Sequence, residues 1–171
     1  MEILNDFNTS VEKALSEIDK NWKKYSGLII CGTHTPHPQD AEEQIKKIKK
    51  ARENKNPFLG ICFGHQLAAI EYARNVLDQT EATSEEWGAD NGDFIVKRLP
   101  QLNVGIKEVF YNGEKHFESF WNNYEVDNGM LDLWKTEDNF ITCQFHPEYQ
   151  SSKDKPHPLL VKFIRYAKMA M

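Results

Sequence analysis

The sequence predicts an α/β fold in which helices cover a parallel sheet. Two continuous apolar runs, at residues 28–31 and 57–59, are typical of strands that are buried on both faces. Each run is followed by a segment with the apolar spacing of an amphipathic helix, at 41–52 and from 64 to 77. Because a helix between two strands returns the chain to the same end of a sheet, this order favours parallel pairing.

The segments before and between these elements are less regular. Residues 10–24 carry an apolar residue at every third or fourth position, which predicts a surface helix capped by Thr9 or Ser10. Two prolines within 33–40 predict a loop there. The segment 1–4 is too short to predict a further strand.

The second half of the chain is predicted to hold several short strands and one further helix. Polar residues dominate 78–92, which predicts a loop. Residues 140–145 are predicted to form a strand that delivers His146, and residues 158–168 to form the last helix. Shorter β-rich pieces lie at 93–96, at 104–111 before an Asn112-Gly113 turn, and at 131–134.

Size and composition are those of an ordinary globular protein, and we expect residues 1–171 to form a single domain. The net charge of −5 gives no reason to expect nucleic acid or an anionic membrane as a partner. No apolar run approaches the roughly 18 residues that span a bilayer. Cys31, Cys62 and Cys143 do not have the spacing of a disulfide framework or a metal knuckle, so we expect reduced thiols, a cytoplasmic protein and no bound metal.

The strongest functional signal is the heptapeptide GICFGHQ at 60–66, which lies between a predicted strand and a predicted helix. A Gly-x-Cys-x-Gly turn in this position is typical of a nucleophile elbow, in which a strained turn holds the reactive atom above the end of a sheet. The positive end of the helix dipole favours the thiolate of Cys62. A thiolate can attack a carboxamide when a nearby acid protonates the leaving nitrogen.

A distant part of the chain, at 144–148, offers that acid. His146 can supply the proton, and Glu148, two residues further along a strand, points to the same side and can hold the imidazole. The backbone N–H of Phe63 is suited to be the first oxyanion donor. Taken singly, Cys62 and His146 could each be buried structural residues. Their joint occurrence at two predicted strand ends favours an active site.

Three stretches of the sequence, with a weaker match at 124–126, resemble class I (triad) glutamine amidotransferase domains, and most of all the glutaminase domain of CTP synthase. They are FLGICFGHQLAAIEYARNV at 58–76, ATSEEW at 82–87, and QFHPEYQSS at 144–152 continuing through 155–159; the weaker match is the shorter YEV. The resemblance covers the chain from about residue 26 to its end. It implies a three-layer αβα sandwich with a central, mostly parallel sheet and Cys62 at the carboxyl edge of that sheet.

The resemblance also implies a reaction that needs no cofactor. Cys62 would attack the γ-carboxamide of glutamine or of another γ-glutamyl small molecule, and the released ammonia would pass to a synthase subunit. His146 would act as acid and then as base, with Glu148 orienting it. The other implied site residues are the backbone of Gly32, Thr33 and Phe63 as an oxyanion hole, and Gly60, Gln66, Glu86 and Tyr124 around the substrate.

Three departures from the family pattern leave alternatives open. Thr33 stands where the family has a second glycine, and threonine disfavours the φ > 0 conformations that glycine reaches easily. The segment 119–123 replaces an Arg/His-rich run, which removes a guanidinium suited to an α-carboxylate. The N-terminus before the first buried strand is shorter than in the family. The alternatives are a hydrolase or transferase of another γ-glutamyl compound, and a catalytically weak binding or regulatory subunit.

Overall fold

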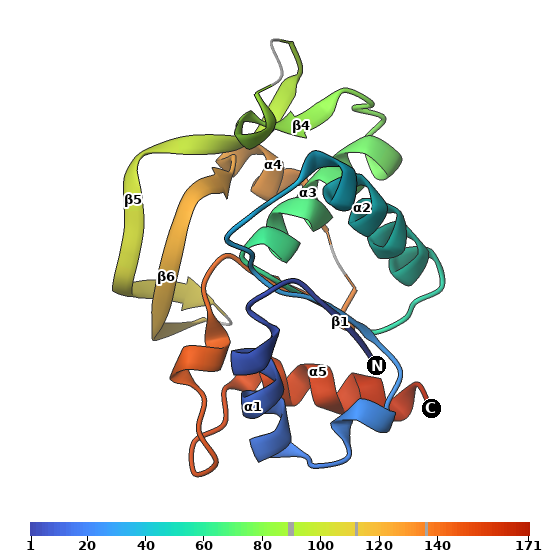
Figure 1. The fold of residues 1–171 in the computed structure, drawn as a ribbon, viewed down its shortest axis with the longest axis vertical. Coiled ribbons are helices and arrows are strands. Elements are labelled where there is room, and N and C mark those ends of the chain that lie inside the picture. Colours follow the sequence, from blue (N-terminus) through green and yellow to red (C-terminus); the bar gives the residue numbers. More distant parts are fainter. Residues whose placement is uncertain (89–90, 112, 136) are drawn as a thin grey trace.

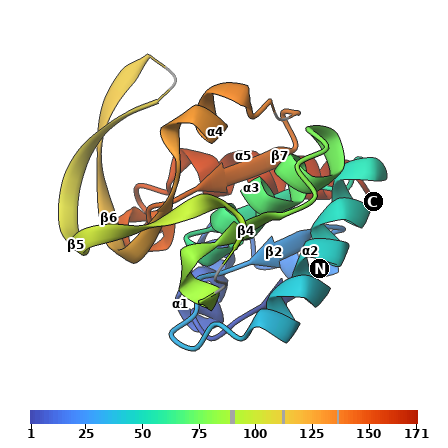
Figure 2. The same cartoon turned by 90° about the horizontal axis from the view of Figure 1, so that it is seen from above.

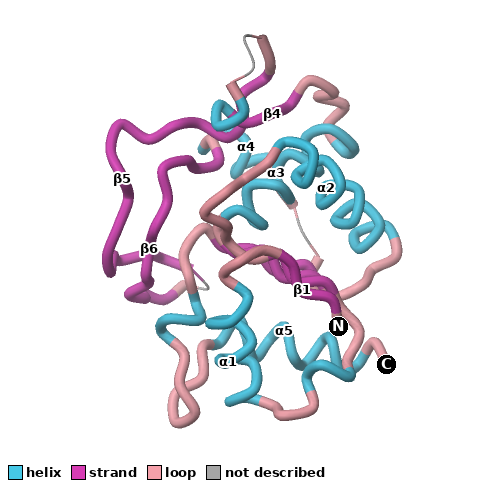
Figure 3. Tube along the Cα trace, viewed as in Figure 1, coloured by secondary structure: helices cyan, strands magenta, loops and turns pink. Residues whose placement is uncertain are grey.

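The computed structural model describes residues 1–88, 91–111, 113–135 and 137–171. At its centre lies a four-stranded parallel sheet in the order β1-β2-β3-β7, drawn in magenta with helices in cyan in Figure 3. The two apolar runs at 28–31 and 57–59 supply neighbouring parallel strands, as the sequence predicts. The strands are β1 (Glu2–Leu4), β2 (Leu28–Ile30), β3 (Phe58–Ile61) and β7 (Phe140–Cys143).

Helices cover both faces of this sheet and complete a three-layer αβα sandwich (Figures 1 and 2). The alternation of side chains along β2 divides the core in two: Ile29 packs with residues of α1 and α5, whereas Leu28 and Ile30 pack with residues of α2 and α3. The predicted fold class is therefore confirmed. The helices are α1 (Asn8–Ile18) and α5 (Pro158–Met169) on one face, and α2 (Pro38–Glu53) and α3 (Phe63–Val76) on the other.

A second sheet stands beside the first and contains three strands in the order β4-β5-β6. β4 pairs with β5 in parallel, and β5 and β6 form a long antiparallel ribbon that arches away from the helices (Figures 1 and 2). The backbone N–H of His146 donates to the carbonyl of Ser119 over 2.8 Å, which holds β6 next to the segment after β7. The strands are β4 (Ala82–Ser84), β5 (Asp93–Tyr111) and β6 (Glu114–Val126).

The N-terminal elements differ from the predicted ones. The segment 1–4, judged too short for a strand, contains the edge strand β1 that pairs with β2. The helix predicted at 10–24 is shorter, because α1 ends before Asp19, whose backbone is extended and whose carboxylate accepts hydrogen bonds from the residues that follow. A separate 3₁₀ turn, η1 (Trp22–Lys24), comes next. Neither predicted cap is used, since α1 begins at Asn8 without a side-chain cap.

Two further predicted boundaries were wrong. The loop predicted at 33–40 ends earlier, because α2 begins at Pro38, where the missing N–H of proline removes no helical hydrogen bond. The strand predicted at 131–134 is instead the end of α4 (Asn128–Leu133). The carboxylate of Asp127 accepts a hydrogen bond from the N–H of Gly129 over 3.0 Å and caps this helix.

The strands and turns between residues 78 and 126, which form the second sheet, were only partly predicted. Within the loop predicted at 78–92 lie β4 and a 3₁₀ turn, η2 (Glu85–Trp87). The pieces at 93–96 and 104–111 belong to one strand, β5, and β6 was not predicted. In the Asn112-Gly113 turn, Asn112 lies outside the described residues. Among the helices that the structure describes, none has the length and apolarity that a membrane crossing requires.

The turn between β3 and α3 presses the backbone of α3 against β2. A Cβ atom on Gly64 would overlap the carbonyl oxygen of Ile30, and one on Gly60 would lie 2.8 Å from the carbonyl oxygen of Gly64. A real side chain does not fit at either position, so both require glycine. The glycines of the Gly-x-Cys-x-Gly turn therefore let α3 start directly at the edge of the sheet.

Replacing Gly64 with alanine should destabilise the fold, because the added methyl group must displace either α3 or β2. We expect Gly64→Ala to lower the free energy of unfolding by roughly 3 kcal/mol or more, measured by urea denaturation. Gly129→Ala is the matched control, since its Cβ would meet only a carboxylate oxygen of the Asp127 side chain, which can move. Equal stability of the two variants would contradict the close approach of Gly64 to the carbonyl of Ile30.

Candidate active site

Cys62 occupies the turn between β3 and α3 in a backbone conformation that few residues other than glycine adopt (φ 54°, ψ −102°). Its N–H donates to the carbonyl of Cys143 in β7 over 2.9 Å. The strained turn sets the sulfur at the carboxyl edge of the sheet and at the N-terminus of α3. The residue is 9% exposed, so the turn shelters it from solvent.

His146 and Glu148 form a buried pair beside this turn. Nδ1 of His146 lies 2.8 Å from Oε1 of Glu148. The pair does not lie on a strand, as the sequence analysis expected, because β7 ends at Cys143. A 3₁₀ turn, η3 (Pro147–Gln150), follows His146 and folds the carboxylate back toward the imidazole. Within the described residues, the buried Nε2 of His146 has no hydrogen-bond partner of ordinary geometry, which leaves this nitrogen free for chemistry.

Gly32 shows that the sulfur and the imidazole share one site. A Cβ atom on Gly32 would lie 3.2 Å from Cε1 of His146 and 3.6 Å from Cβ of Cys62, so both side chains border the same small residue. Burial opposes a charge on His146, but the side chains of Cys62 and Glu148 outweigh it and raise the pKa of His146 to about 10. At neutral pH the imidazole is therefore protonated and can donate a proton.

Two residues that the sequence analysis did not assign also contact the sulfur. Nε2 of Gln144 lies 3.6 Å from Sγ of Cys62, and the carbonyl oxygen of Trp121 lies 3.7 Å from it. Gln144 lies in the stretch 144–152 that resembles the family, so the sequence did indicate that this segment belongs to the site. Trp121 contacts the sulfur through its backbone carbonyl oxygen. The pattern of side chains in a sequence does not reveal a backbone contact of this kind.

A cavity of about 270 Å³ opens beside Cys62, between the start of α3, the segment 33–36 and β6. Asn122 and Asn123 of β6 are on its wall as well, and they were not predicted as site residues. Gly32 and Gly60 are not on the wall, since Gly32 lies against His146 and Gly60 inside the turn. The predicted site residues that line the cavity are Thr33, Cys62, Phe63, Gln66, Glu86 and Tyr124.

Glu86 gives the cavity wall an acidic group. Burial raises the pKa of Glu86. Among the described residues, no ion pair includes this carboxylate, and the described lining of the cavity holds no lysine or arginine. The side chain of Asn122 is not free to take the place of the arginine that the family has in this segment. Its amide is already hydrogen-bonded to Asn103 and to the carbonyl of Tyr124. The wall is therefore suited to an ammonium group and poorly suited to a carboxylate.

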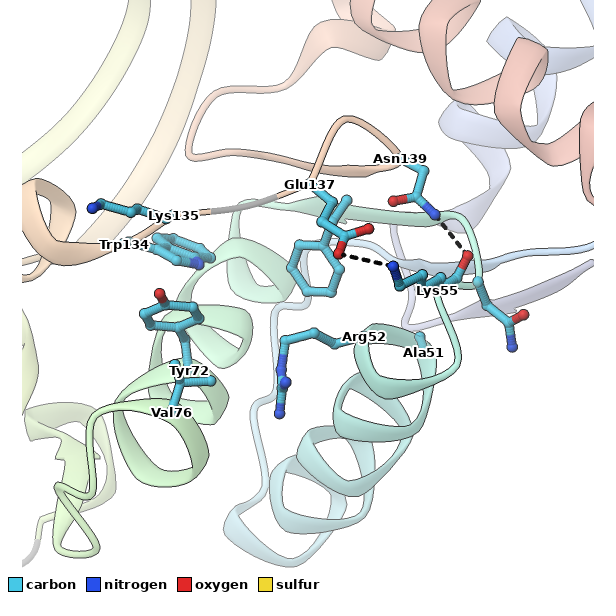
Figure 4. Close-up of a pocket in the computed structure, with 11 residues that line it drawn as sticks. Ala51, Arg52, Lys55, Tyr72, Val76, Trp134, Lys135, Glu137 and Asn139 are labelled. Atoms are coloured by element: carbon cyan, nitrogen blue, oxygen red, sulfur yellow. Dashed lines mark hydrogen bonds and ion pairs between the residues drawn. The ribbon is translucent and has the colours of Figure 1, made fainter.

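A second cavity, of about 210 Å³, lies at the amino end of β7 and thus at the opposite edge of the sheet from Cys62 (Figure 4). Some of its charged side chains are engaged with other groups: Arg52 donates to both oxygens of the buried Glu71, over 2.7 and 2.8 Å. Nζ of Lys55 lies 3.7 Å from Glu137. None of the predicted site residues lines this cavity, as far as the described residues show.

The sequence matches the family model of class I glutamine amidotransferases over residues 4–166. This match takes in nearly the whole chain, which therefore belongs to the class I glutamine amidotransferase family. Members of this family are typically enzymes that hydrolyse glutamine. The resemblance inferred from 58–76 and 144–152 is confirmed at the level of family and fold.

Curated relatives are CTP synthases. The chain is 30% identical to the enzyme of Carboxydothermus hydrogenoformans over 196 residues, which covers 90% of this chain and 35% of the relative. It is 32% identical to that of Pelagibacter ubique over 203 residues, covering 90% and 37%. The chain thus spans little more than a third of these relatives.

A solved structure with a similar fold is the glutaminase domain of Trypanosoma brucei CTPS with bound acivicin. The TM-score is 0.80, and the match covers 100% of this chain and 95% of that one at 18% identity. The two chains therefore share a fold.

The raised pKa of His146 should depend on Cys62 and should make stability depend on pH. The pKa rises from 6.5 to about 10 on folding, so the stabilisation is complete below pH 6.5 and is lost as the pH rises through 10. We expect Cys62→Ala to lower the pKa of His146, measured by NMR of labelled histidine. We also expect the variant to lose less stability than the unmodified chain between pH 6.5 and 10. An unchanged pKa of His146 in the variant would contradict the arrangement.

Proposed function

We propose that this chain is a glutaminase-type amidotransferase that cleaves a γ-glutamyl amide through a thioester on Cys62. The observation that carries the proposal is that Cys62 and His146 both border Gly32, with Glu148 bonded to His146 and Cys62 on the wall of a cavity. Residues 1–171 would act as one domain. The three cysteines are free, which suits the reducing conditions of the cytoplasm.

In the first half of the proposed reaction, the thiolate of Cys62 attacks the γ-carbonyl carbon of the substrate. The negative charge moves to the carbonyl oxygen, where backbone N–H groups would stabilise it. Phe63 supplies one donor, because its N–H lies in the first turn of α3 and has no acceptor within the helix. Gly32 and Thr33 are the nearest source of a second. His146 gives its proton to the leaving nitrogen, which departs as ammonia while the thioester forms.

In the second half, water attacks the thioester. His146 has lost its proton to the leaving group and is now neutral, so it can take a proton from the attacking water. The thioester collapses, Cys62 leaves as thiolate, and the γ-carboxyl group of the product releases its remaining proton to solvent. Throughout, Glu148 keeps Nδ1 of the imidazole protonated and Nε2 directed to the reaction.

Recognition of the substrate would rest on Glu86 and Gln66. Among the described residues, the half-buried carboxylate of Glu86 has no ion-pair partner, and the α-ammonium group of a γ-glutamyl compound would supply one. Glutamine is the default substrate. The similarity to CTP synthases suggests that the ammonia would pass to a synthase subunit.

A hydrolase or transferase of another γ-glutamyl compound is the second candidate, and one observation favours it. The described residues on the cavity wall include no lysine or arginine for an α-carboxylate. A γ-glutamyl compound whose α-carboxylate is masked would not need that cation. The rest of the machinery, including Cys62 and His146, would act in the same way.

Turnover by the purified chain tests the proposal and separates its alternatives. With glutamine we expect glutamate and ammonia, none from Cys62→Ala, and at least about a hundredfold lower kcat from Glu148→Gln, which no longer fixes the imidazole. Faster turnover of another γ-glutamyl amide would select the second candidate. Turnover that survives Cys62→Ala would contradict the mechanism. No turnover of any γ-glutamyl amide would leave a binding or regulatory subunit.

Glu86 should act on substrate binding rather than on the chemical step. We expect Glu86→Gln to raise KM for the best substrate about tenfold or more while kcat changes little, because the lost contact is the same in ground state and transition state. Glu85→Gln is the matched control, since Glu85 is not on the cavity wall and accepts from the N–H of Arg98. A drop in kcat at unchanged KM would assign Glu86 a different role.

A further inference from the structure

The sulfur of Cys62 lies between one donor and one acceptor that are outside the predicted triad. Nε2 of Gln144 is 3.6 Å from Sγ, and the carbonyl oxygen of Trp121 is 3.7 Å from it. A carbonyl oxygen favours the neutral thiol, because it can accept from S–H but repels a thiolate. An amide N–H favours the thiolate, since hydrogen bonds to a charged acceptor are the stronger ones. Gln144 is thus placed to favour the reactive form of Cys62.

The orientation of the Gln144 amide is fixed by a second glutamine. A glutamine side chain can present its oxygen or its nitrogen, and only the bonding network decides which. The carbonyl oxygen of Tyr124 can only accept, so the atom of Gln66 that lies 2.8 Å from it is Nε2. The same nitrogen lies 3.2 Å from Gln144, which must therefore turn its oxygen toward Gln66. Nε2 of Gln144 is then left to face the sulfur.

This chain of bonds joins three separate parts of the site. Tyr124 belongs to β6, Gln66 to the first turns of α3, and Gln144 to the segment that leads from β7 to His146. Both protons on the amide nitrogen of Gln66 are used, so only its Oε1 remains for a substrate. Gln66 can then meet an α-ammonium group as an acceptor, but it cannot donate to a carboxylate.

We propose that Gln144 is a further catalytic residue, whose amide N–H stabilises the thiolate of Cys62, and that Gln66 is the positioning residue that orients it. The inference rests on the proposed function only for the identity of the nucleophile. The step is a hydrogen bond to sulfur, so no covalent bond forms or breaks at Gln144. The bond weakens once the sulfur is acylated and neutral, and it re-forms when the thiolate leaves.

The test is the rate at which iodoacetamide alkylates Cys62 in the full chain, followed by peptide mass spectrometry. This readout separates Cys62 from the buried Cys31 and Cys143, and it requires no turnover. At pH 7 we expect Gln144→Leu to slow alkylation about tenfold, because the thiolate loses one charge-assisted hydrogen bond. Gln66→Leu should slow it less, since the amide of Gln144 remains but is free to rotate.

Gln150→Leu is the matched control, because Gln150 lies on η3 and its amide donates to the hydroxyl of Ser119 over 2.9 Å, not to the sulfur. Should Gln144→Leu fail to fold, Gln144→Met removes the same donor from an unbranched side chain of similar length. We expect the control to react like the unmodified chain. Equal alkylation rates at pH 7 in the Gln144 variants and the control would overturn the proposal.

A pH profile distinguishes stabilisation of the thiolate from simple packing. At alkaline pH every variant carries a full thiolate, so the rates of Gln144→Leu and the unmodified chain should converge. A deficit that persists unchanged at alkaline pH would overturn the proposed role in favour of a displaced side chain. Because alkylation needs no substrate, a failed glutaminase assay with a positive alkylation result would reject the proposed function and not the role of Gln144.

Discussion

The geometry of the site depends on one close approach, between the backbone of α3 at Gly64 and the end of β2 at Ile30. Because no side chain stands between them, α3 starts directly at the sheet edge and Cys62 is held in a left-handed turn. Parallel strands end at the same edge, where β2 leads to Gly32 and β7 leads to His146. The proposed nucleophile, acid and oxyanion donors can therefore meet, although they follow three separate strands.

Electrostatics then gives one imidazole two roles in the proposed reaction. Burial opposes a charge on His146, but the side chains of Cys62 and Glu148 together raise its pKa to about 10, so an acid is ready before the substrate binds. Once the sulfur is acylated it carries no charge, and the pKa of His146 must fall. The same group becomes a base at the step that needs one.

Three strands of the central sheet and the position of Cys62 could be predicted because their signals are local: apolar runs and two glycines around one cysteine. The contact between His146 and Glu148 is present, but a 3₁₀ turn makes it and not the expected strand. β6 could not be predicted, because it reverses the usual burial of apolar and charged side chains: Trp121 is 58% exposed, whereas Glu118 is 2% exposed. Only tertiary contacts, such as the 2.9 Å bond between Glu118 and His157, make that arrangement stable.

The most direct test of Cys62 as the nucleophile is mass spectrometry of the protein quenched in acid during turnover of its best γ-glutamyl amide. A thioester is stable in acid, and peptide mapping locates it. We predict a γ-glutamyl adduct on Cys62 and none on Cys31 or Cys143, which are buried and away from the cavity wall. Product formation without an adduct on Cys62, or an adduct on another residue, would contradict the mechanism.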